Sequence, residues 1–277
     1  MGLRINTNIQ ALAAQRSLGA NRQAQEKSLE RLSSGYRINR AGDDAAGLAI
    51  SERIRSNVRS LAQAGRNAQD GISLVQVAEG GTNEISNILV RMRELSIQGA
   101  SDTIGDLERG FIHKEVVALK SEIDRIATST EFNGTKLLNG SAEMLEVQVG
   151  LNNNPGQDRM IIDPKQQNVT LQALGLENLS TQTKVQSQEN LSMVDHALNV
   201  VMSNRADLGA MQNRLQSTIN NINIYKENLE AARSRIRDTD MAEETSELTK
   251  DNILTQAGVS VLAQANANPQ QALKLLS

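Results

Sequence analysis

Apolar residues recur at intervals of three and four along most of this chain, and the longest such run lies between Glu189 and Asp238. These intervals place the apolar side chains on one side of a helix. A heptad pattern kept this long is typical of a helix that supercoils with a partner, and no proline interrupts it. The run predicts one helix of about 48 residues, roughly 70 Å long, and hence an elongated molecule. Its apolar positions are Leu191, Val194, Leu198, Val201, Leu208, Met211, Leu215, Ile219, Ile222, Tyr225, Leu229, Ala232 and Ile236.

Two further stripes of the same kind precede this helix. The first follows Asp43 and Asp44, whose carboxylates can cap a helix start, and it ends near Gly99. The second follows a turn-rich segment, residues 101–106. We expect the three helices to bury their stripes against one another as a bundle. The two shorter stripes are Ile54, Val58, Leu61, Gly65, Ala68, Ile72, Val75, Ile85, Met92 and Leu95, and then Ile112, Val116, Leu119, Ile123 and Ile126.

The helical period is lost in the middle of the chain. Residues 145–149 alternate apolar and polar, as a half-buried strand does. Residues 152–156 have the composition of a hairpin loop, and residues 159–163 are expected to form the returning strand. Asn-Gly dipeptides upstream indicate turns. Residues 164–183 are expected to be loop, with a short turn around 171–176.

Both ends of the chain carry thinner, Ala-rich stripes at helical spacing. Gly35 is placed to end the first helix, whereas Asp240 with Glu243 resembles a capping box that starts the last, which Pro269 ends or distorts. Ordering each end costs on the order of 1.5 kcal/mol per residue, which a thin stripe recovers poorly within one molecule. The ends are therefore either disordered tails or helices that fold when several copies pack together. Their regular spacing and modest charge favour the second interpretation. The stripe residues are Ile5, Ile9, Leu12, Leu18, Leu29 and Leu32 at one end, and Leu254, Ala257, Val261, Leu262 and Ala265 at the other.

The predicted fold is mainly α: an elongated, coiled-coil-like helical bundle with a small β-hairpin region, in which the N- and C-terminal helices pair. We divide it into an N-terminal helix at 1–42, a rod-shaped bundle at 43–238 and a C-terminal helix at 239–277. The hairpin insert occupies about 141–183 of the bundle.

Composition removes several classes of function. A net charge of −3 gives no basic field for nucleic acid, and two tyrosines and two phenylalanines supply few stacking platforms. The absence of cysteine excludes disulfides and thiolate metal sites. No apolar run reaches the length of about 18 residues that a membrane span requires. The N-terminal residues lack an apolar signal core, so export, if it occurs, does not use an ordinary cleaved signal.

No catalytic or metal-binding constellation emerges from the sequence, and we expect no cofactor and no enzymatic activity. His113-Lys-Glu115 lacks the second histidine that a zinc-protease helix needs one turn on. Asp195 and His196 are adjacent on a helix, so their side chains diverge. Asp43 and Asp44 fit helix capping better than cation binding. Two classes remain, a self-assembling structural protein and a soluble helical-bundle binding or sensing module.

Motifs at both ends resemble those of bacterial flagellin. Together they cover nearly the whole chain, and their length makes the resemblance specific. They are Ile5–Asn8, Ala14–Arg16, Arg31–Gly35, Arg37–Asn39, Gly42–Ile50 and Gln69–Leu74 near one end, and Leu208–Leu215, Glu227–Leu229, Ala232–Asp238 and Val261–Asn266 near the other.

The resemblance implies a subunit that polymerises into the extracellular filament used for swimming. The terminal stripes would pack as the filament core, inside a layer of rod bundles. The chain would be secreted through the flagellar export apparatus, with a secretion chaperone, filament cap and hook-junction proteins as partners. The central insert is small, so the short form without outer variable domains is expected, with the hairpin associated with switching between filament states. A hook-associated junction protein is the alternative within the same class.

One further feature follows from the resemblance. Leu89–Leu95 resembles the segment through which many flagellins are recognised by Toll-like receptor five. The matching recognition residues would be Arg91, Leu95 and, on the next helix, Glu115. The alternative is that these residues form a contact between subunits.

Overall fold

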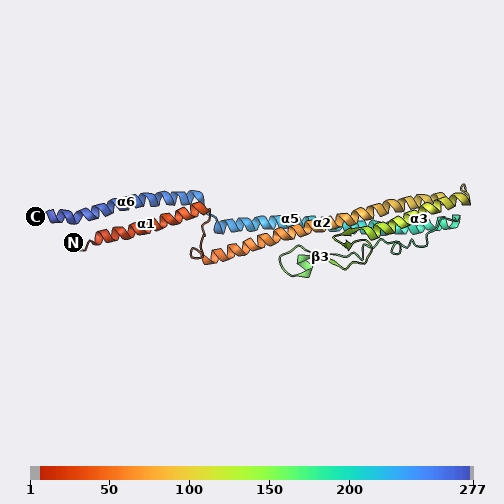
Figure 1. Cartoon of the computed structure of the whole chain (residues 1–277), viewed down its shortest axis with the longest axis horizontal. Helices are drawn as coiled ribbons and strands as arrows, with labels where there is room; N and C mark the ends of the chain where they lie inside the picture. The colour runs from red at the N-terminus through yellow and green to blue at the C-terminus, as the bar shows by residue number, and fades with distance from the viewer. Residues whose placement is uncertain (1–6, 275–277) are drawn as a thin grey trace. The chain divides into compact units, whose positions relative to one another are not determined.

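The structure, a computed structural model, describes residues 7–274 and is mainly helical (Figure 1). Ile5 therefore lies outside the described residues. In chain order the elements are α1 (Ile9–Ser34), α2 (Ala45–Gly99), α3 (Asp106–Ser129), β1 (Glu131–Phe132), β2 (Thr135–Lys136), β3 (Leu145–Gln148), α4 (Pro155–Asp158), β4 (Arg159–Ile162), α5 (Lys184–Arg237) and α6 (Met241–Lys274). The predicted α fold, with long helices, paired terminal helices and a small hairpin, is confirmed.

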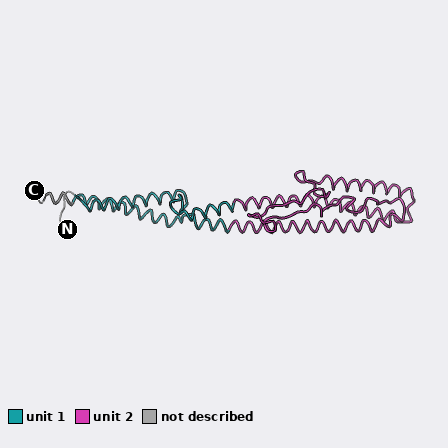
Figure 2. The backbone as a smooth tube through the Cα atoms, turned by 90° about the horizontal axis from the view of Figure 1, so that it is seen from below, with its two compact units in different colours: residues 1–58, 228–277 teal, residues 59–227 magenta. Residues whose placement is uncertain are grey.

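The chain divides into two compact units (Figure 2). One comprises residues 1–58 and 228–277, and the other comprises residues 59–227. Both α2 and α5 contribute residues to each unit. We refer to them below as the terminal unit and the bundle unit.

The bundle unit buries the predicted stripes of α2, α3 and α5 against one another. Ile85, Leu89 and Met92 of α2 and Val116 and Ile123 of α3 are fully buried. The loop between β4 and α5 completes this core, because its apolar residues are buried in the same cluster. Those loop residues are Val169, Leu174, Leu176 and Leu179.

Arg109, on α3, holds the turn that joins α2 to α3. Its guanidinium is buried and donates to the carbonyl oxygens of Gly99 and Ser101, at 3.0 and 2.9 Å. It also pairs with the exposed carboxylate of Asp106 at 2.8 Å. The last carbonyls of α2 lack intrahelical partners, so a buried cation at this position satisfies them and suits the helix dipole.

The predicted hairpin is present, with an addition at its tip. Strands β3 and β4 pair antiparallel from Leu145 opposite Ile162 to Gln148 opposite Arg159. The expected loop contains one helical turn, α4, which has proline near its first position. The buried Asp158 carboxylate accepts the Asn154 N–H at 3.1 Å. Gly150 folds over this carboxylate so closely that an added Cβ would lie 1.8 Å from Oδ1 of Asp158, and no other residue fits there without rearrangement.

Several boundaries differ from the sequence prediction. Helix α5 begins at Lys184 rather than Glu189, because Thr183 and Gln186 cap it reciprocally: the Thr183 N–H donates to Gln186 Oε1 and the Gln186 N–H to Thr183 Oγ1, each at 3.3 Å. One of the predicted Asn-Gly turns, Asn133-Gly134, closes a second hairpin, β1–β2, which the sequence did not suggest. Helix α6 continues past Pro269 to Lys274.

Helix caps follow the sequence prediction elsewhere. Gly35, with φ of 72°, ends α1 in the left-handed conformation. Asp44 accepts the Gly47 N–H at the start of α2, and Asp240 accepts the Ala242 N–H at the start of α6. Asp43 has a different partner, because its carboxylate pairs with Lys27 of α1 at 2.8 Å.

Candidate interaction surface on the terminal helices

Helices α1 and α6 lie antiparallel and side by side in the terminal unit (Figure 1). Near the start of α1, the Asn8 amide donates to the Ala265 carbonyl oxygen at 2.7 Å. At its other end, Arg31 pairs with Glu244 of α6 at 3.3 Å. The N- and C-terminal helices thereby form one pair, as the sequence predicted.

The row of residues between these two helices is half polar, and its apolar half consists mostly of small side chains. Leu18 is its main apolar contact and lies against Gly258, where an added Cβ would be 3.4 Å from Leu18 Cδ1. Most other inward positions carry amides, hydroxyls, carboxylates or methyl groups. The row consists of Asn8, Ala11, Ala14, Leu18, Asn21, Gln25 and Ser28 on α1, and Glu244, Leu248, Asp251, Thr255, Gly258, Leu262 and Ala265 on α6. The heptad spacing of these polar residues was the available signal for this row, and an analysis of apolar positions alone missed it.

The larger apolar side chains of the pair point outward instead. Ile9 is 65% exposed, Leu12 is 54% exposed and Val261 is 59% exposed. The same holds for Leu29, Met241, Ile253, Leu254 and Val259, all exposed. A single copy thus presents more large apolar residues to water along these helices than it buries between them, a surface typical of a protein-contact site.

The predicted end-stripe residues separate into two sets. Leu18 and Ala265 are buried and Leu32 and Leu262 are half-buried, so these four belong to the pair itself. The outward set is Ile9, Leu12, Leu29, Leu254, Ala257 and Val261. The structure does not bring the two sets together, because they lie on different sides of their helices.

A clamp of backbone and side-chain contacts joins the α1–α2 connection to the end of α5. Tyr36 and Asp238 form an isolated antiparallel bridge, and the Arg37 N–H donates to the Arg237 carbonyl oxygen at 2.7 Å. The Arg237 guanidinium lies over the Tyr36 ring, 4.7 Å from its centroid, and pairs with Glu52 at 2.6 Å. An arginine that is both stacked on a ring and ion-paired has less conformational freedom than one on the open surface. This clamp therefore fixes the path of the chain between α1 and α2.

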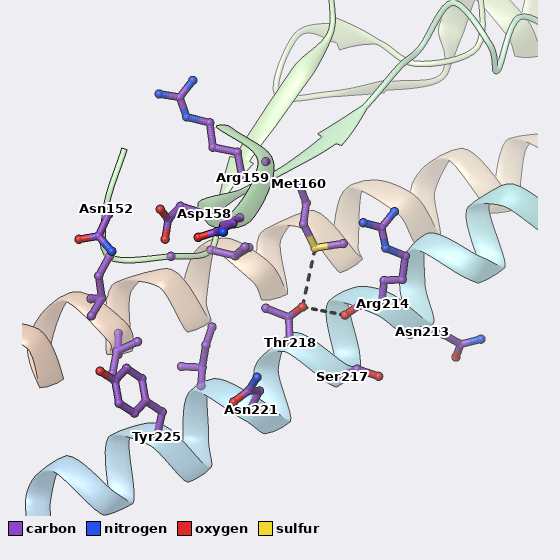
Figure 3. A pocket seen from close by; sticks show the side chains of 17 residues that line it. Asn152, Asp158, Arg159, Met160, Asn213, Arg214, Ser217, Thr218, Asn221 and Tyr225 are labelled. Atoms are coloured by element: carbon purple, nitrogen blue, oxygen red, sulfur yellow. Dashed lines mark hydrogen bonds between the residues drawn. The ribbon is translucent and has the colours of Figure 1, made fainter. Parts of the chain in front are cut away.

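In the bundle unit, a cleft of about 660 Å³ lies between the hairpin tip and α5 (Figure 3). Met160 and Thr218 face each other across it, with Sδ and Oγ1 3.9 Å apart, and Thr218 also donates to the Arg214 carbonyl oxygen at 2.9 Å. Its remaining lining mixes amide and hydroxyl groups, among them Asn152, Asn213, Ser217 and Asn221, with apolar and charged side chains. This arrangement contains no nucleophile paired with a base, so the cleft has the character of a docking contact for the hairpin.

The residues matched to receptor recognition occupy different environments. Arg91 pairs with Glu115 of α3 and with Glu94, each at 2.9 Å, on the exposed surface of the bundle unit. These contacts raise the pKa of the Arg91 guanidinium, with the hydrogen bond to Glu94 as the main cause. Leu95 is only 2% exposed and belongs to the bundle core. The structure therefore brings Arg91 and Glu115 together and places Leu95 beneath the surface.

The histidines make no site in the part of the chain that the structure describes. His113 Nδ1 accepts the Thr181 N–H at 3.4 Å, and His196 is exposed while Asp195 pairs with Arg93 at 2.6 Å. Over residues 7–274, no group of three histidine or acidic side chains is arranged to hold a metal ion. Nor does any described helix have both the length and the apolar character needed to cross a bilayer.

Comparison with known proteins finds similar sequences for both halves of the chain. A family profile described as the bacterial flagellin N-terminal helical region matches residues 5–143, and one for the C-terminal helical region matches residues 191–276. A flagellin of Halalkalibacterium halodurans is 46% identical over 276 residues, which cover 98% of this chain and 99% of that protein. A flagellin of Bacillus subtilis is 46% identical over 307 residues, covering 99% and 100%.

Solved structures agree in fold. The crystal structure of Bacillus cereus flagellin superimposes with a TM-score of 0.51 at 31% identity, covering 57% of this chain and 88% of that one. A putative flagellar hook-associated protein from Vibrio parahaemolyticus gives a TM-score of 0.58 over 71% of this chain and 100% of its own. Its identity is 15%, so that likeness concerns the fold alone.

Proposed function

The chain belongs to the bacterial flagellin family, as a short form that builds the flagellar filament, and from this premise we propose that α1 and α6 pack as the filament core. The chain is a structural protein and not an enzyme. Nothing in the comparisons favours the hook-associated alternative over the filament subunit. The observation that carries the proposal is the outward apolar set on α1 and α6, which a lone copy leaves in water.

The energetic argument concerns which side of each helix is satisfied within one copy. Fully burying a Leu, Ile or Val side chain contributes about 1.5–3 kcal/mol. The row inside the α1–α6 pair has few such residues, whereas Ile9, Leu12, Ile253 and Val261 remain available on the outside. Packing several copies side by side buries them, so association supplies stabilisation that the pair lacks alone. Because the subunits form a filament, these contacts join two different surface patches and do not close on themselves.

The rod predicted from the sequence, which contains the whole bundle unit, is assigned to a layer around this core. In this proposal residues 43–238 form the rod of that layer, while 1–42 and 239–277 form the inner part. The hairpin, residues 145–163, takes part in switching between filament states. Its docking through Met160 and Thr218 on α5 supports that role, since a shift of the hairpin would be transmitted to a long helix. Filaments that switch normally after replacement of the hairpin would contradict it.

Secretion and accessory partners extend the same proposal. Homologous flagellins form an extracellular filament, and we assign this chain to the same location. It would reach the filament tip through the flagellar export apparatus. A secretion chaperone, the filament cap and hook-junction proteins would be its partners on that route.

The surface pair Arg91–Glu115 is proposed as a recognition site for Toll-like receptor five. A planar guanidinium held by two carboxylates presents fixed donors on an exposed face. Leu95 would act by supporting α2 from the core. Purified monomer should activate receptor reporter cells, and Arg91→Ala should lower that response without changing helicity. Absence of any response to the unaltered monomer would remove this part of the proposal.

Electron microscopy of concentrated protein tests the core assignment. The full chain should form filaments, whereas a chain trimmed of residues 1–34 and 241–277 should not. Circular dichroism of the trimmed chain provides the control, since the bundle unit keeps its own buried core. Filaments of the same diameter and length from the trimmed chain would show that α1 and α6 are dispensable for assembly.

A further inference from the structure

A charged cleft runs along one edge of the α1–α6 pair in the terminal unit. Its volume is about 540 Å³. The α1 wall contains Ala24, Lys27, Ser28 and Arg31, and the α6 side contains Glu243, Glu244, Glu247, Lys250 and Asp251, with Arg37, Thr239 and Asp240 at one end. The small side chains of Ala24 and Ser28 leave the space that the cleft occupies.

Most charges around the cleft are already paired within the chain. Lys27 pairs with Asp43, Arg31 with Glu244, and Lys250 with Glu247 at 3.0 Å. Asp240 caps α6. Among the described residues of this cleft, the carboxylates of Asp240, Glu243 and Asp251 have no cation. Arg37, at the end of the cleft near Asp240, forms no ion pair with a described residue, and its guanidinium donates to the Ile236 carbonyl oxygen at 2.7 Å.

Asp251 is the exceptional member. Its residue is 7% exposed, and its carboxylate accepts no hydrogen bond from any residue within 7–274. The hydroxyl of Thr255, one turn further along α6, is also buried without a partner. Asp251 is mostly buried and its carboxylate faces the open cleft without a cation from its own chain, so the cleft favours a cation supplied from outside the chain.

A suitable cation lies on the opposite edge of the same helical pair. Gln25 closes that edge, because its amide donates to Asn252 Oδ1 at 2.6 Å. Arg22 precedes Gln25 by three residues and so lies on the same edge, away from the cleft. It is exposed and forms no ion pair with a described residue. Contacts in an open helical polymer join unlike patches, which allows one edge of a copy to meet the other edge of its neighbour.

We propose that in the filament the guanidinium of Arg22 from a neighbouring copy enters the cleft and pairs with the carboxylate of Asp251. The inference rests on the proposed packing of α1 and α6 as the filament core. It adds a specific charged contact to an otherwise apolar association and fixes the register of adjacent copies. An arginine suits this position because its planar fork of donors can pair with both oxygens of a carboxylate.

A double-mutant cycle on the full chain tests the pairing. Asp251→Asn and Arg22→Gln remove the charge but keep a polar side chain, and each should raise the critical concentration for polymerisation, measured by sedimentation, on the order of tenfold. The double variant should be no worse than either single variant, because both remove the same contact. Effects that multiply in the double variant, or no effect from either substitution, would overturn the pairing.

Two controls keep the outcome specific. Arg16→Gln removes another exposed arginine of α1 that forms no ion pair with a described residue, and it should leave the critical concentration within about twofold. A charge exchange, Asp251→Arg with Arg22→Asp, should polymerise better than Asp251→Arg alone, and failure of that rescue in a chain of normal helicity counts against the inference. The unaltered chain runs beside every variant. If the unaltered chain forms no filaments, the proposed function fails together with the pairing. If it forms filaments but the two substitutions act independently on the critical concentration, only the pairing is overturned.

Discussion

Replacing Val261 with aspartate separates assembly from folding. Val261 lies on the outer side of α6 and is 59% exposed, so the substitution leaves the row facing α1 unchanged. Burying the exposed part of a valine side chain on assembly contributes about 1–2 kcal/mol per subunit. Aspartate forfeits this contribution and would place a carboxylate without a partner in an apolar contact, which costs a further several kcal/mol.

The expected result is a rise of more than about a hundredfold in the critical concentration, since about 1.4 kcal/mol corresponds to a factor of ten. Val261→Ala serves as the matched control, because it removes methyl groups without adding charge, and its critical concentration should rise roughly threefold to tenfold. Sedimentation and electron microscopy measure the polymer, and circular dichroism checks the dissolved chain. Leu12→Asp on α1 should behave in the same way, since Leu12 is also exposed. Filaments from Val261→Asp at the unaltered critical concentration would refute the assignment of this face to subunit contacts.

Three further substitutions test contacts within the units. Gly150→Ala should lower the free energy of unfolding of the bundle unit by about 1–3 kcal/mol, because the added Cβ collides with the Asp158 carboxylate. Thermal denaturation measures this loss, and an unchanged melting temperature would contradict the close approach of Gly150 to Asp158. Arg109→Ala should cost about 2–4 kcal/mol by leaving buried carbonyl oxygens unpaired, and urea titration that shows less than about 0.5 kcal/mol would argue against the buried contacts. The pKa of Asp43 is lowered to about 2, chiefly by its hydrogen bond with Lys27, so the stability it confers is present above its ordinary value of 3.8 and is lost as the pH falls toward 2. An NMR titration should show this midpoint and its return toward 3.8 in Lys27→Ala, and a midpoint that does not move would exclude Lys27 as the cause.

The long helices were predictable because their apolar spacing extends over many turns. The stripe through Ile85, Met92 and Leu95 is buried as expected, and these heptad positions form part of the bundle core. The start of α5 was placed late because its first turn is specified by the polar capping box of Thr183 and Gln186 rather than by apolar residues. Local hydrogen bonding set that boundary.

The terminal helices show what spacing alone could not resolve. On α6, Leu254 and Val261 lie on a different side from Leu262 and Ala265, although all four follow one another at short helical intervals. Which side meets α1 depends on the partner's shape, since Leu18 fits where Gly258 leaves room. The position of Leu95 was equally ambiguous, because a resemblance aligns residues without stating which of them the fold covers.

The half-polar row between α1 and α6 has a consequence for how a subunit is added to a growing fibre. Half of the residues in this row carry amides, hydroxyls or carboxylates, which can hydrogen-bond to water, and most of the others are small. Separating the two helices therefore exposes less apolar surface than opening a leucine-rich seam would. A newly arrived molecule could therefore keep its two ends apart until neighbours are in place. The pairing of α1 with α6 and their packing against neighbouring subunits would then occur together. The last step of folding for each molecule would take place at the fibre tip.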